Sequence, residues 1–256
     1  MKHICCYSGG KDSGASIILA HENNEPLDVI VFSEVMFDNE NNISGENPKH
    51  IDFILNKAKP LFESWGYEFI VLHADKDYLD CFYHVIERPK KHMEHKGMRN
   101  GFAPFGMCNV KRDCKLKPIE EWKKTIKEPY MQYVGIGIDE HKRLESLHKD
   151  KTQISLLEKY NYTTEMAKEK CLEYGLLSPA YDLSKRGGCW FCPNAKLLEH
   201  EVLRNTDRKT WDRFVALENE TNIVNYKWNI YGDTLKERDE QLEWKNRQMT
   251  IFDLIS

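Results

Sequence analysis

The stretch Ser8-Gly9-Gly10-Lys11-Asp12-Ser13 separates a short apolar run from a segment with helical character. Such a strand–turn–helix junction brings backbone N–H groups and a helix N-terminus to one point, which favours an anion. The glycines let the backbone approach phosphate oxygens without Cβ clashes, the serines supply hydroxyl donors, and Lys11 supplies a point charge. The P-loop spacing is absent, since no glycine stands five residues before a Gly-Lys-Ser/Thr triplet. An ordinary tight turn with a helix cap is the alternative interpretation.

Strand-like and helix-like segments alternate along the first half of the chain. Short apolar, β-branched runs predict strands at residues 2–7, 27–33, 67–72 and 130–138. Helical character predicts helices at residues 13–21, 48–65 and 116–126. Strands that alternate with helices pair in parallel, so the sequence predicts an α/β fold with a doubly wound, mostly parallel sheet.

Two irregular stretches interrupt this alternation. Residues 88–107 contain several glycines and prolines and predict a long loop or flap, and residues 178–193 form a second irregular stretch. Further helices are predicted at residues 194–205, 207–220 and 234–247. We therefore expect a nucleotide-binding domain at residues 1–193 that also carries a cysteine site, followed by a helical C-terminal extension at residues 194–256.

Composition excludes several classes of protein. The 256 residues are 41% hydrophobic and 30% charged, which predicts a folded globular core rather than disorder. No apolar run approaches the length of a membrane span, and residues 17–20 are too short for a signal-peptide core, so we expect a cytoplasmic protein. The net charge of −4 argues against a protein that coats nucleic acid with its whole surface.

Four of the eight cysteines form two close pairs far apart in the chain. Cys189 and Cys192 have the two-residue gap that lets both thiolates bind one metal centre, and Gly187 and Gly188 precede them in a knuckle-like turn. Cys108 and Cys114 offer a second pair. Four thiolates suit either a tetrahedral zinc or a 4Fe–4S cluster. Four unrelated buried thiols are the alternative interpretation.

The other cysteines have a simpler interpretation. A disulfide framework is not expected in an unsecreted chain of this size. The remaining four are expected to pack as small hydrophobes in strands or helices, namely Cys5, Cys6, Cys81 and Cys171.

The glycine loop resembles the PP-loop of the N-type ATP pyrophosphatases, also called the adenine nucleotide alpha hydrolase superfamily, and most closely that of the PAPS reductase-like family. Residues 133–143, reading YVGIGIDEHKR, are similar to the family's Gly-Ile-Arg-x-Asp-Glu-x-x-x-Arg element. Gly137 stands where the family often has arginine, which puts one polar contact in doubt. Residues 109–122 and 187–194 resemble the family's cysteine-bearing segments.

This resemblance implies an enzyme that cleaves ATP to AMP and pyrophosphate by adenylating an acceptor, with or without transfer of sulfur. Magnesium would neutralise the departing pyrophosphate, and Lys11, Asp12 and Arg143 would carry catalysis. Asp12 instead suits a helix cap, and Asp139 and Glu140 are either a second acidic contact or first-turn residues. The nucleotide would be held by Ser8, Gly9, Gly10, Lys11, Asp12, Ser13, Ser33, Glu34 and Gly135.

The resemblance also bears on the metal and on the reaction. Superfamily sulfurtransferases that modify DNA hold an iron–sulfur cluster with four such cysteines, whereas other relatives hold zinc, so we favour the cluster and keep zinc as the alternative. True PAPS reductases carry a nucleophilic cysteine near the C-terminus, but no cysteine follows Cys192 here. An enzyme that processes APS or PAPS with an external thiol, and a non-catalytic nucleotide-sensing or DNA-associated module, remain alternatives.

Two features point to macromolecular partners. Residues 88–127 contain twelve Lys or Arg against four Asp or Glu, which suits a tRNA or DNA acceptor bound locally, although a solvated helix face has the same composition. Residues Gln248–Phe252, reading QMTIF, look like the short peptides that bind bacterial replication clamps. An apolar tail that docks on its own core is the alternative for that segment.

Overall fold

The computed structural model describes residues 1–103, 106, 108–184, 188–229 and 232–253, the last five of these by their backbone alone. The chain forms two compact units. The first comprises Met1–Glu34, Lys49–Ala74 and Lys115–Gly187, and the second comprises Val35–Pro48, Asp75–Cys114 and Gly188–Ser256. The boundary that the sequence suggests between residues 193 and 194 falls inside the second unit.

A five-stranded sheet with every neighbouring pair parallel forms the centre of the first unit. Its strands, in spatial order, are β5 (Glu68–His73), β2 (Val29–Glu34), β1 (Lys2–Tyr7), β7 (Tyr130–Tyr133) and β8 (Gln153–Ile154). The order of the strands reverses between β1 and β7. The prediction of a doubly wound parallel α/β fold is therefore confirmed.

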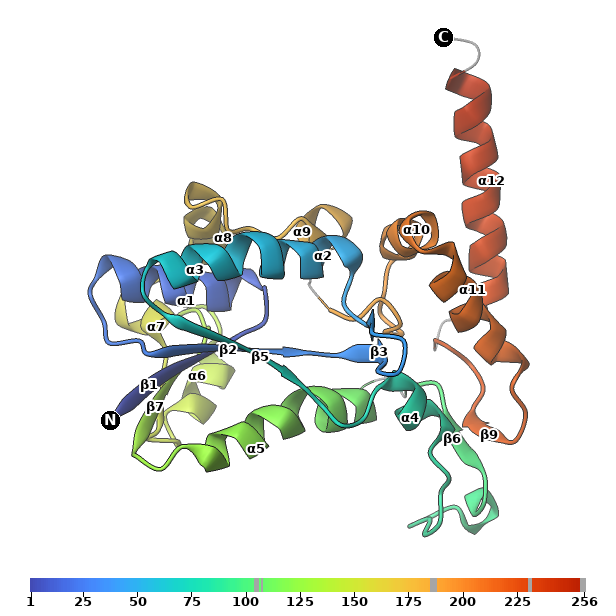
Figure 1. Ribbon diagram of the computed structural model, residues 1–256, viewed down its shortest axis with the longest axis horizontal. Coiled ribbons are helices and arrows are strands. Elements are labelled where there is room, and N and C mark those ends of the chain that lie inside the picture. Colours follow the sequence, from blue (N-terminus) through green and yellow to red (C-terminus); the bar gives the residue numbers. More distant parts are fainter. Residues whose placement is uncertain (104–105, 107, 185–187, 230–231, 254–256) are drawn as a thin grey trace. The chain divides into compact units, whose positions relative to one another are not determined.

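Helices cover both faces of this sheet (Figure 1). One face carries α1 (Lys11–Glu22) and the continuous helical stretch of α2 (Pro48–Phe53), π-helix η1 (Ile54–Ala58) and α3 (Lys59–Ser64). The opposite face carries α5 (Lys117–Thr125), which follows π-helix η3 (Lys111–Leu116). The shorter helices of this unit are α6 (His141–Leu147), α7 (Leu156–Lys159), α8 (Thr164–Glu173) and α9 (Ala180–Leu183).

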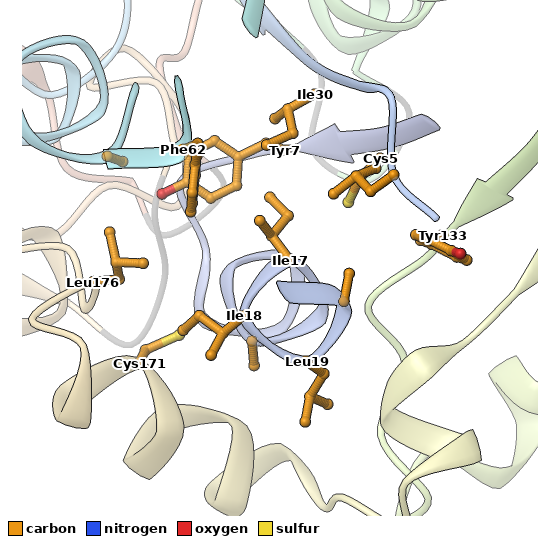
Figure 2. Packing of buried hydrophobic residues seen from close by; sticks show 14 of the residues in the cluster. Cys5, Tyr7, Ile17, Ile18, Leu19, Ile30, Phe62, Tyr133, Cys171 and Leu176 are labelled. Atoms are coloured by element: carbon orange, nitrogen blue, oxygen red, sulfur yellow. The ribbon is translucent and has the colours of Figure 1, made fainter. Parts of the chain in front are cut away.

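Alternation along the strands divides the core between the two faces. Cys5 and Tyr7 of β1 belong to the buried cluster that contains α1, whereas Ile4 belongs to the cluster against α5. Figure 2 shows Ile17 pointing toward Tyr7, while Ile18 on the same helix lies toward Cys171 of α8. All eight residues from Ser13 to Ala20 are buried, because α1 is covered by the sheet on one side and by α7 and α8 on the other. The expectation that Cys5 and Cys171 pack as small buried side chains is met, since both have no exposed surface.

Two of the predicted elements differ from the structure. The strand predicted at residues 130–138 ends at Tyr133. The Val134 N–H still donates to the Ile154 carbonyl oxygen at 3.0 Å, but Val134 and Ile136 pack against Leu144 and Leu147 of α6. Glycines at positions 135 and 137 alternate with these apolar residues, so the sequence pattern of a strand continues where the strand itself does not. The helix predicted at residues 48–65 is interrupted by the π-helical turn of η1.

The second unit contains short strands and a helical C-terminal part. The strand β3 (Met36–Asp38) pairs antiparallel with β4 (Ile43–Ser44), and β6 (Arg99–Gly101) pairs parallel with β9 (Ile223–Asn225). The pairing of β6 corrects the expectation that residues 88–107 form an irregular loop throughout. The helices are α4 (Tyr78–Tyr83), η2 (Met93–His95), α10 (Leu197–Thr206), α11 (Arg208–Ala216), η4 (Leu217–Asn219) and α12 (Leu235–Asp253).

The C-terminal helices extend the prediction for this part of the chain. Helices α10, α11 and α12 pack on one another, and the predicted helix at residues 234–247 continues to Asp253. The segment Gln248–Phe252 therefore has helical backbone, and its binding to a clamp stays a prediction. Within the described part of the chain, no helix has both the length and the apolar character needed to cross a membrane.

Candidate active site and cysteine centre

The turn between β1 and α1 opens at the point where the strand order reverses. Strand β1 ends at Tyr7, and α1 begins at Lys11 with Gly10 as its extended N-cap residue. No described side chain caps this helix by a hydrogen bond from its N-cap position. In open parallel sheets, the crevice at the carboxyl ends of the strands beside such a reversal is the usual ligand site. The predicted anion-binding loop thus occupies the position that the topology favours.

Hydrogen bonds inside the turn hold its two serines together. The Ser8 N–H donates to Ser13 Oγ at 3.3 Å, and the Gly10 N–H donates to Ser8 Oγ at 3.4 Å. The Ser13 hydroxyl donates to the Gly10 carbonyl oxygen at 3.1 Å. Both hydroxyls therefore order the loop itself, in addition to any contact they make with a bound anion.

Two close approaches require glycine at this site. Gly9 has a φ of 70°, and a Cβ there would lie 2.4 Å from Cε1 of His50. A Cβ on Gly135, just beyond β7, would lie 2.5 Å from the backbone carbon of Asp12. Side chains at either position would push the loop or the first turn of α1 out of place. Gly10 is different, since its φ is −84° and its nearest neighbour would be Ser8 Oγ at 3.1 Å.

The four charged residues predicted near the phosphates lie together. Lys11 Nζ is 2.7 Å from Asp12 Oδ1 and donates to the Thr164 carbonyl oxygen at 2.9 Å. Arg143 at the start of α6 pairs with Glu140 at 2.5 Å. The pKa of Asp12 is raised above its ordinary value, chiefly because the carboxyl is partly removed from water. Glu140 adds to this effect, whereas Lys11 and Arg143 oppose it. These side chains therefore form one electrostatic group around the N-terminus of α1.

Asp139 has a structural role in this group. Its carboxylate accepts the Thr164 N–H at 2.9 Å and the Thr164 hydroxyl at 2.7 Å. Hydrogen bonding by Thr164 lowers the pKa of Asp139, so this carboxylate is ionised at neutral pH. The Thr164 carbonyl oxygen in turn accepts a hydrogen bond from Lys11 Nζ. Asp139 therefore helps to position Lys11 by holding Thr164 in place.

Two residues at the loop were not foreseen from the sequence. His50 is fully buried in α2, with Nε2 3.1 Å from the Ser8 carbonyl oxygen and Nδ1 2.7 Å from Ser178 Oγ. The Tyr181 hydroxyl accepts the Lys11 backbone N–H at 3.0 Å. Neither residue lies in a recognisable motif, and the one local signal is that His50 belongs to a segment of helical spacing that ends in Trp65.

The predicted adenosine contacts, Ser33 and Glu34, lie at the carboxyl end of β2 beside β1. Ser33 Oγ is buried and has no hydrogen-bond partner among the described residues. Glu34 is buried and lies 2.9 Å from His73 Nε2 at the end of β5. The hydrogen bond and charge of Glu34 raise the pKa of His73 above its ordinary 6.5, against the opposing effect of burial.

The four predicted metal-binding cysteines, Cys108, Cys114, Cys189 and Cys192, all belong to the second unit. The Cys192 N–H donates to the Cys189 carbonyl oxygen at 3.2 Å, as expected for a tight turn between them. Cys108 Sγ accepts the Lys111 N–H at 3.3 Å. Cys114 Sγ lies 3.6 Å from Cys81 Sγ, so a fifth cysteine joins the group. Cys81 is buried, as predicted, and the sulfur beside it is that of another thiol.

An aromatic cluster surrounds the turn between Cys189 and Cys192. Trp190 and Phe191 are buried, and their rings pack with Phe37, Tyr78 and Phe214. Burial raises the pKa of Tyr78, and the thiols of Cys108, Cys81 and Cys192 are near enough to raise it further. The Tyr78 hydroxyl is buried without a hydrogen-bond partner in the described part of the chain.

These observations fit a thiolate-bound metal, although the cysteines do not form a tight group. Among the described residues, three or more candidate ligand atoms come within 4.8 Å of one another only at His92, Glu94 and His95, a largely exposed set in the basic stretch. That stretch is itself divided, with residues 88–114 in the second unit and residues 115–127 in the first. Two hydrogen-bond donors would suit metal-bound thiolates as acceptors. They are the buried Tyr78 hydroxyl, which has no partner among the described residues, and the Lys111 N–H, which donates to Cys108 Sγ.

Comparisons with known proteins give one structural resemblance and no match in sequence. No protein-family model matches the sequence, and no curated protein matches it. A solved structure that it resembles is the U34-tRNA thiolase NcsA from Methanococcus maripaludis with its 4Fe–4S cluster. The sequences are 14% identical, the alignment covers 95% of this chain and 72% of the thiolase chain, and the TM-score is 0.41. The chemistry of the site therefore has to be derived from its own geometry.

The steric limit at Gly9 predicts an unequal effect of two neighbouring substitutions. Gly9→Ala combines a positive φ with a clash on His50 and should lower the free energy of unfolding by about 1–3 kcal/mol. Gly10→Ala, the matched control, should cost less than about 1 kcal/mol because its backbone suits any residue. Urea denaturation of both variants measures this difference, and equal losses would contradict the close approach of His50.

The pair of Glu34 and His73 predicts a pH-dependent contribution to stability. Because the pKa of His73 is raised in the folded state, this contribution is fully present below pH 6.5 and is lost as the pH rises through the raised pKa. Glu34→Gln should move the pKa of His73 down toward 6.5, as measured by NMR titration of the ring. Glu158→Gln, which removes the partner of His148, is the control and should leave His73 unchanged. An unaltered His73 in Glu34→Gln would contradict the pairing.

Proposed function

We propose that this chain binds ATP at the Ser8–Ser13 loop and cleaves it to AMP and pyrophosphate by adenylating an acceptor. The observation that carries this proposal is the loop at the strand-order reversal, where Gly9 and Gly135 are both required by close contacts and the N-cap residue of α1, Gly10, has no capping side chain. That arrangement supports a polyphosphate better than an ordinary turn, because a simple helix start needs neither contact.

The residues around the loop support attack on the α-phosphate. The acceptor oxygen or nitrogen would form a bond to the α-phosphorus while the bond from that phosphorus to the bridging oxygen breaks and pyrophosphate leaves. AMP would stay bonded to the acceptor until a second nucleophile, sulfur or water, displaces it. The N-terminus of α1 and Lys11 would stabilise the added negative charge, and Arg143 would contact the transferred group. Magnesium, when bound, would neutralise the pyrophosphate, and Asp12, a partly buried carboxylate in the first turn of α1, would hold it.

The adenosine would lie toward the carboxyl end of β2. Ser33 offers a buried hydroxyl without a partner among the described residues, and Glu34 is held in place by His73. A hydroxyl of this kind is costly to bury unless a ligand pairs with it. The acceptor in this proposal is a nucleic acid, tRNA or DNA, engaged through basic residues of the stretch 88–127.

Removing the charge of Lys11 tests the reaction. Wild-type protein would be incubated with ATP and magnesium in three arms, with bulk tRNA, with DNA and with neither, and AMP and pyrophosphate would be measured. Lys11→Ala should slow pyrophosphate release at least about 100-fold, because an electrostatic donor to the transferred phosphate is lost. Lys168→Ala, an exposed lysine of α8 in the same unit, is the matched control and should leave the rate unchanged.

Two outcomes would overturn the proposal. Equal rates in Lys11→Ala and wild type would show that the loop does not take part in the reaction. Tight binding of ATP without pyrophosphate release in any arm would indicate a nucleotide sensor instead.

We also propose that the cysteines of the second unit hold a 4Fe–4S cluster. A tetrahedral zinc at about 2.3 Å from each sulfur would bring its four ligands within roughly 3.8 Å of one another. No three of the described cysteine sulfurs come within 4.8 Å of one another, which suits a larger cluster better. Such a cluster would supply electron transfer or a site for sulfur, and these cysteines with their aromatic neighbours would bind and shield it.

The content of metal in the purified protein distinguishes the two centres. Protein purified without oxygen should contain iron and acid-labile sulfide in about equal amounts. Stoichiometric zinc without sulfide would contradict the cluster and leave the alternative, a structural zinc site.

A further inference from the structure

Helix α4 stands between the two groups of cysteines in the second unit. One of its side chains, Cys81, lies 3.6 Å from Cys114 by their sulfur atoms. Another, Tyr78, lies one turn earlier and has its ring centre 4.1 Å from that of Phe191, which belongs to the turn between Cys189 and Cys192. The helix therefore touches both cysteine-bearing segments, although it contributes to neither of the sequence pairs.

The start of α4 is held firmly. Asp77 caps the helix, accepting the Asp80 N–H at 2.8 Å, and its other carboxylate oxygen accepts the Asn39 N–H at 2.7 Å. The Asp77 carbonyl oxygen lies 3.5 Å from Cys114 Sγ. Cys81 is thus fixed against Cys114 by a capped helix and does not reach it through a mobile side chain alone.

Apolar packing explains part of this contact, since Cys81 and Cys114 are both buried. It does not explain the Tyr78 hydroxyl, which is buried at 1% exposure and has no hydrogen-bond partner in the described part of the chain. A buried phenol without a partner is unfavourable, and the thiols of Cys108, Cys81 and Cys192 are among the groups close enough to Tyr78 to raise its pKa. Thiolates bound to a metal are better acceptors than neutral thiols.

We propose that Cys81 is a ligand of the metal centre and that the Tyr78 hydroxyl donates a hydrogen bond to one of its sulfurs. The separation of Cys81 and Cys114 is close to the roughly 3.8 Å between two thiolates on one tetrahedral metal. This inference rests on the proposed metal centre and is independent of ATP cleavage.

Substitution of Cys81 tests the assignment. The isosteric Cys81→Ser removes the thiolate, and the protein purified without oxygen should lose more than half of its bound iron and sulfide, or of its zinc if that is the metal. Cys114→Ser should show the same loss. Cys171→Ser, a fully buried thiol of the first unit, is the matched control and should keep the full content. Circular dichroism and thermal unfolding of each variant confirm that it is folded, and Cys81→Ala replaces Cys81→Ser if the serine variant is not.

The role of Tyr78 has a separate measurement. Tyr78→Phe keeps the ring against Phe191 and removes only the hydroxyl, so the metal content should stay near that of wild type. Loss of an outer hydrogen bond should weaken metal retention by about 10–100-fold in competition with a chelator. Unchanged retention would overturn the hydrogen bond.

The outcomes for Cys81 separate two failures. Wild-type protein without iron, sulfide or zinc would overturn the metal centre and this inference with it, while leaving the ATP reaction to its own test. A full metal content in Cys81→Ser, together with a loss in Cys114→Ser, would overturn the role of Cys81 alone and return it to apolar packing.

Discussion

The position of the Ser8–Ser13 loop depends on how closely the chain beyond β7 passes the first turn of α1. Gly135 has no room for a Cβ beside Asp12, and Gly137 has none beside Asp139 and Thr164. Gly137 stands where the family that this sequence resembles often has arginine. Here the close contacts with Asp139 and Thr164 leave no room for a side chain. Glycine at this position allows Asp139 to hold Thr164, and the Thr164 carbonyl oxygen then accepts from Lys11. The position of the loop's one lysine is therefore fixed by two glycines more than a hundred residues away.

Sequence patterns predict what is local in this fold. The first strand and its turn to α1 are set by neighbouring residues, so their positions could be predicted to within a few residues. The contacts of His50 with Ser8 and of Tyr181 with Lys11 join positions 42 and 170 residues apart, and no local signal marks them. The extended prediction for residues 134–138 failed because Val134 and Ile136 are apolar for a different reason, their packing against α6.

The cysteines show the same limit more sharply. Spacing along the chain pairs Cys108 with Cys114, but the sulfur close to Cys114 is that of Cys81, 33 residues away. The apolar and aromatic residues around Cys81 in the sequence predict a core residue, and Cys81 is indeed buried. Those aromatic residues also join α4 to the Cys189–Cys192 turn, through Tyr78 and Phe191. Spacing therefore predicts the two cysteine pairs, while which sulfur atoms lie close together depends on tertiary packing.

The charges near the loop define what it can hold. Lys11 and Arg143 are matched by Asp12 and Glu140, and the ionised Asp139 lies next to them. The N-terminus of α1 adds only about half a positive charge. A triphosphate brings roughly four negative charges, so these side chains alone cannot neutralise it. In the proposed reaction a divalent cation would have to enter with ATP, and the partly buried Asp12, whose present partner is Lys11, is the carboxylate that would turn to it. Release of Lys11 from Asp12 would at the same time free the lysine to bind a phosphate. Binding of the cation by Asp12 and binding of the phosphate by Lys11 would therefore be coupled.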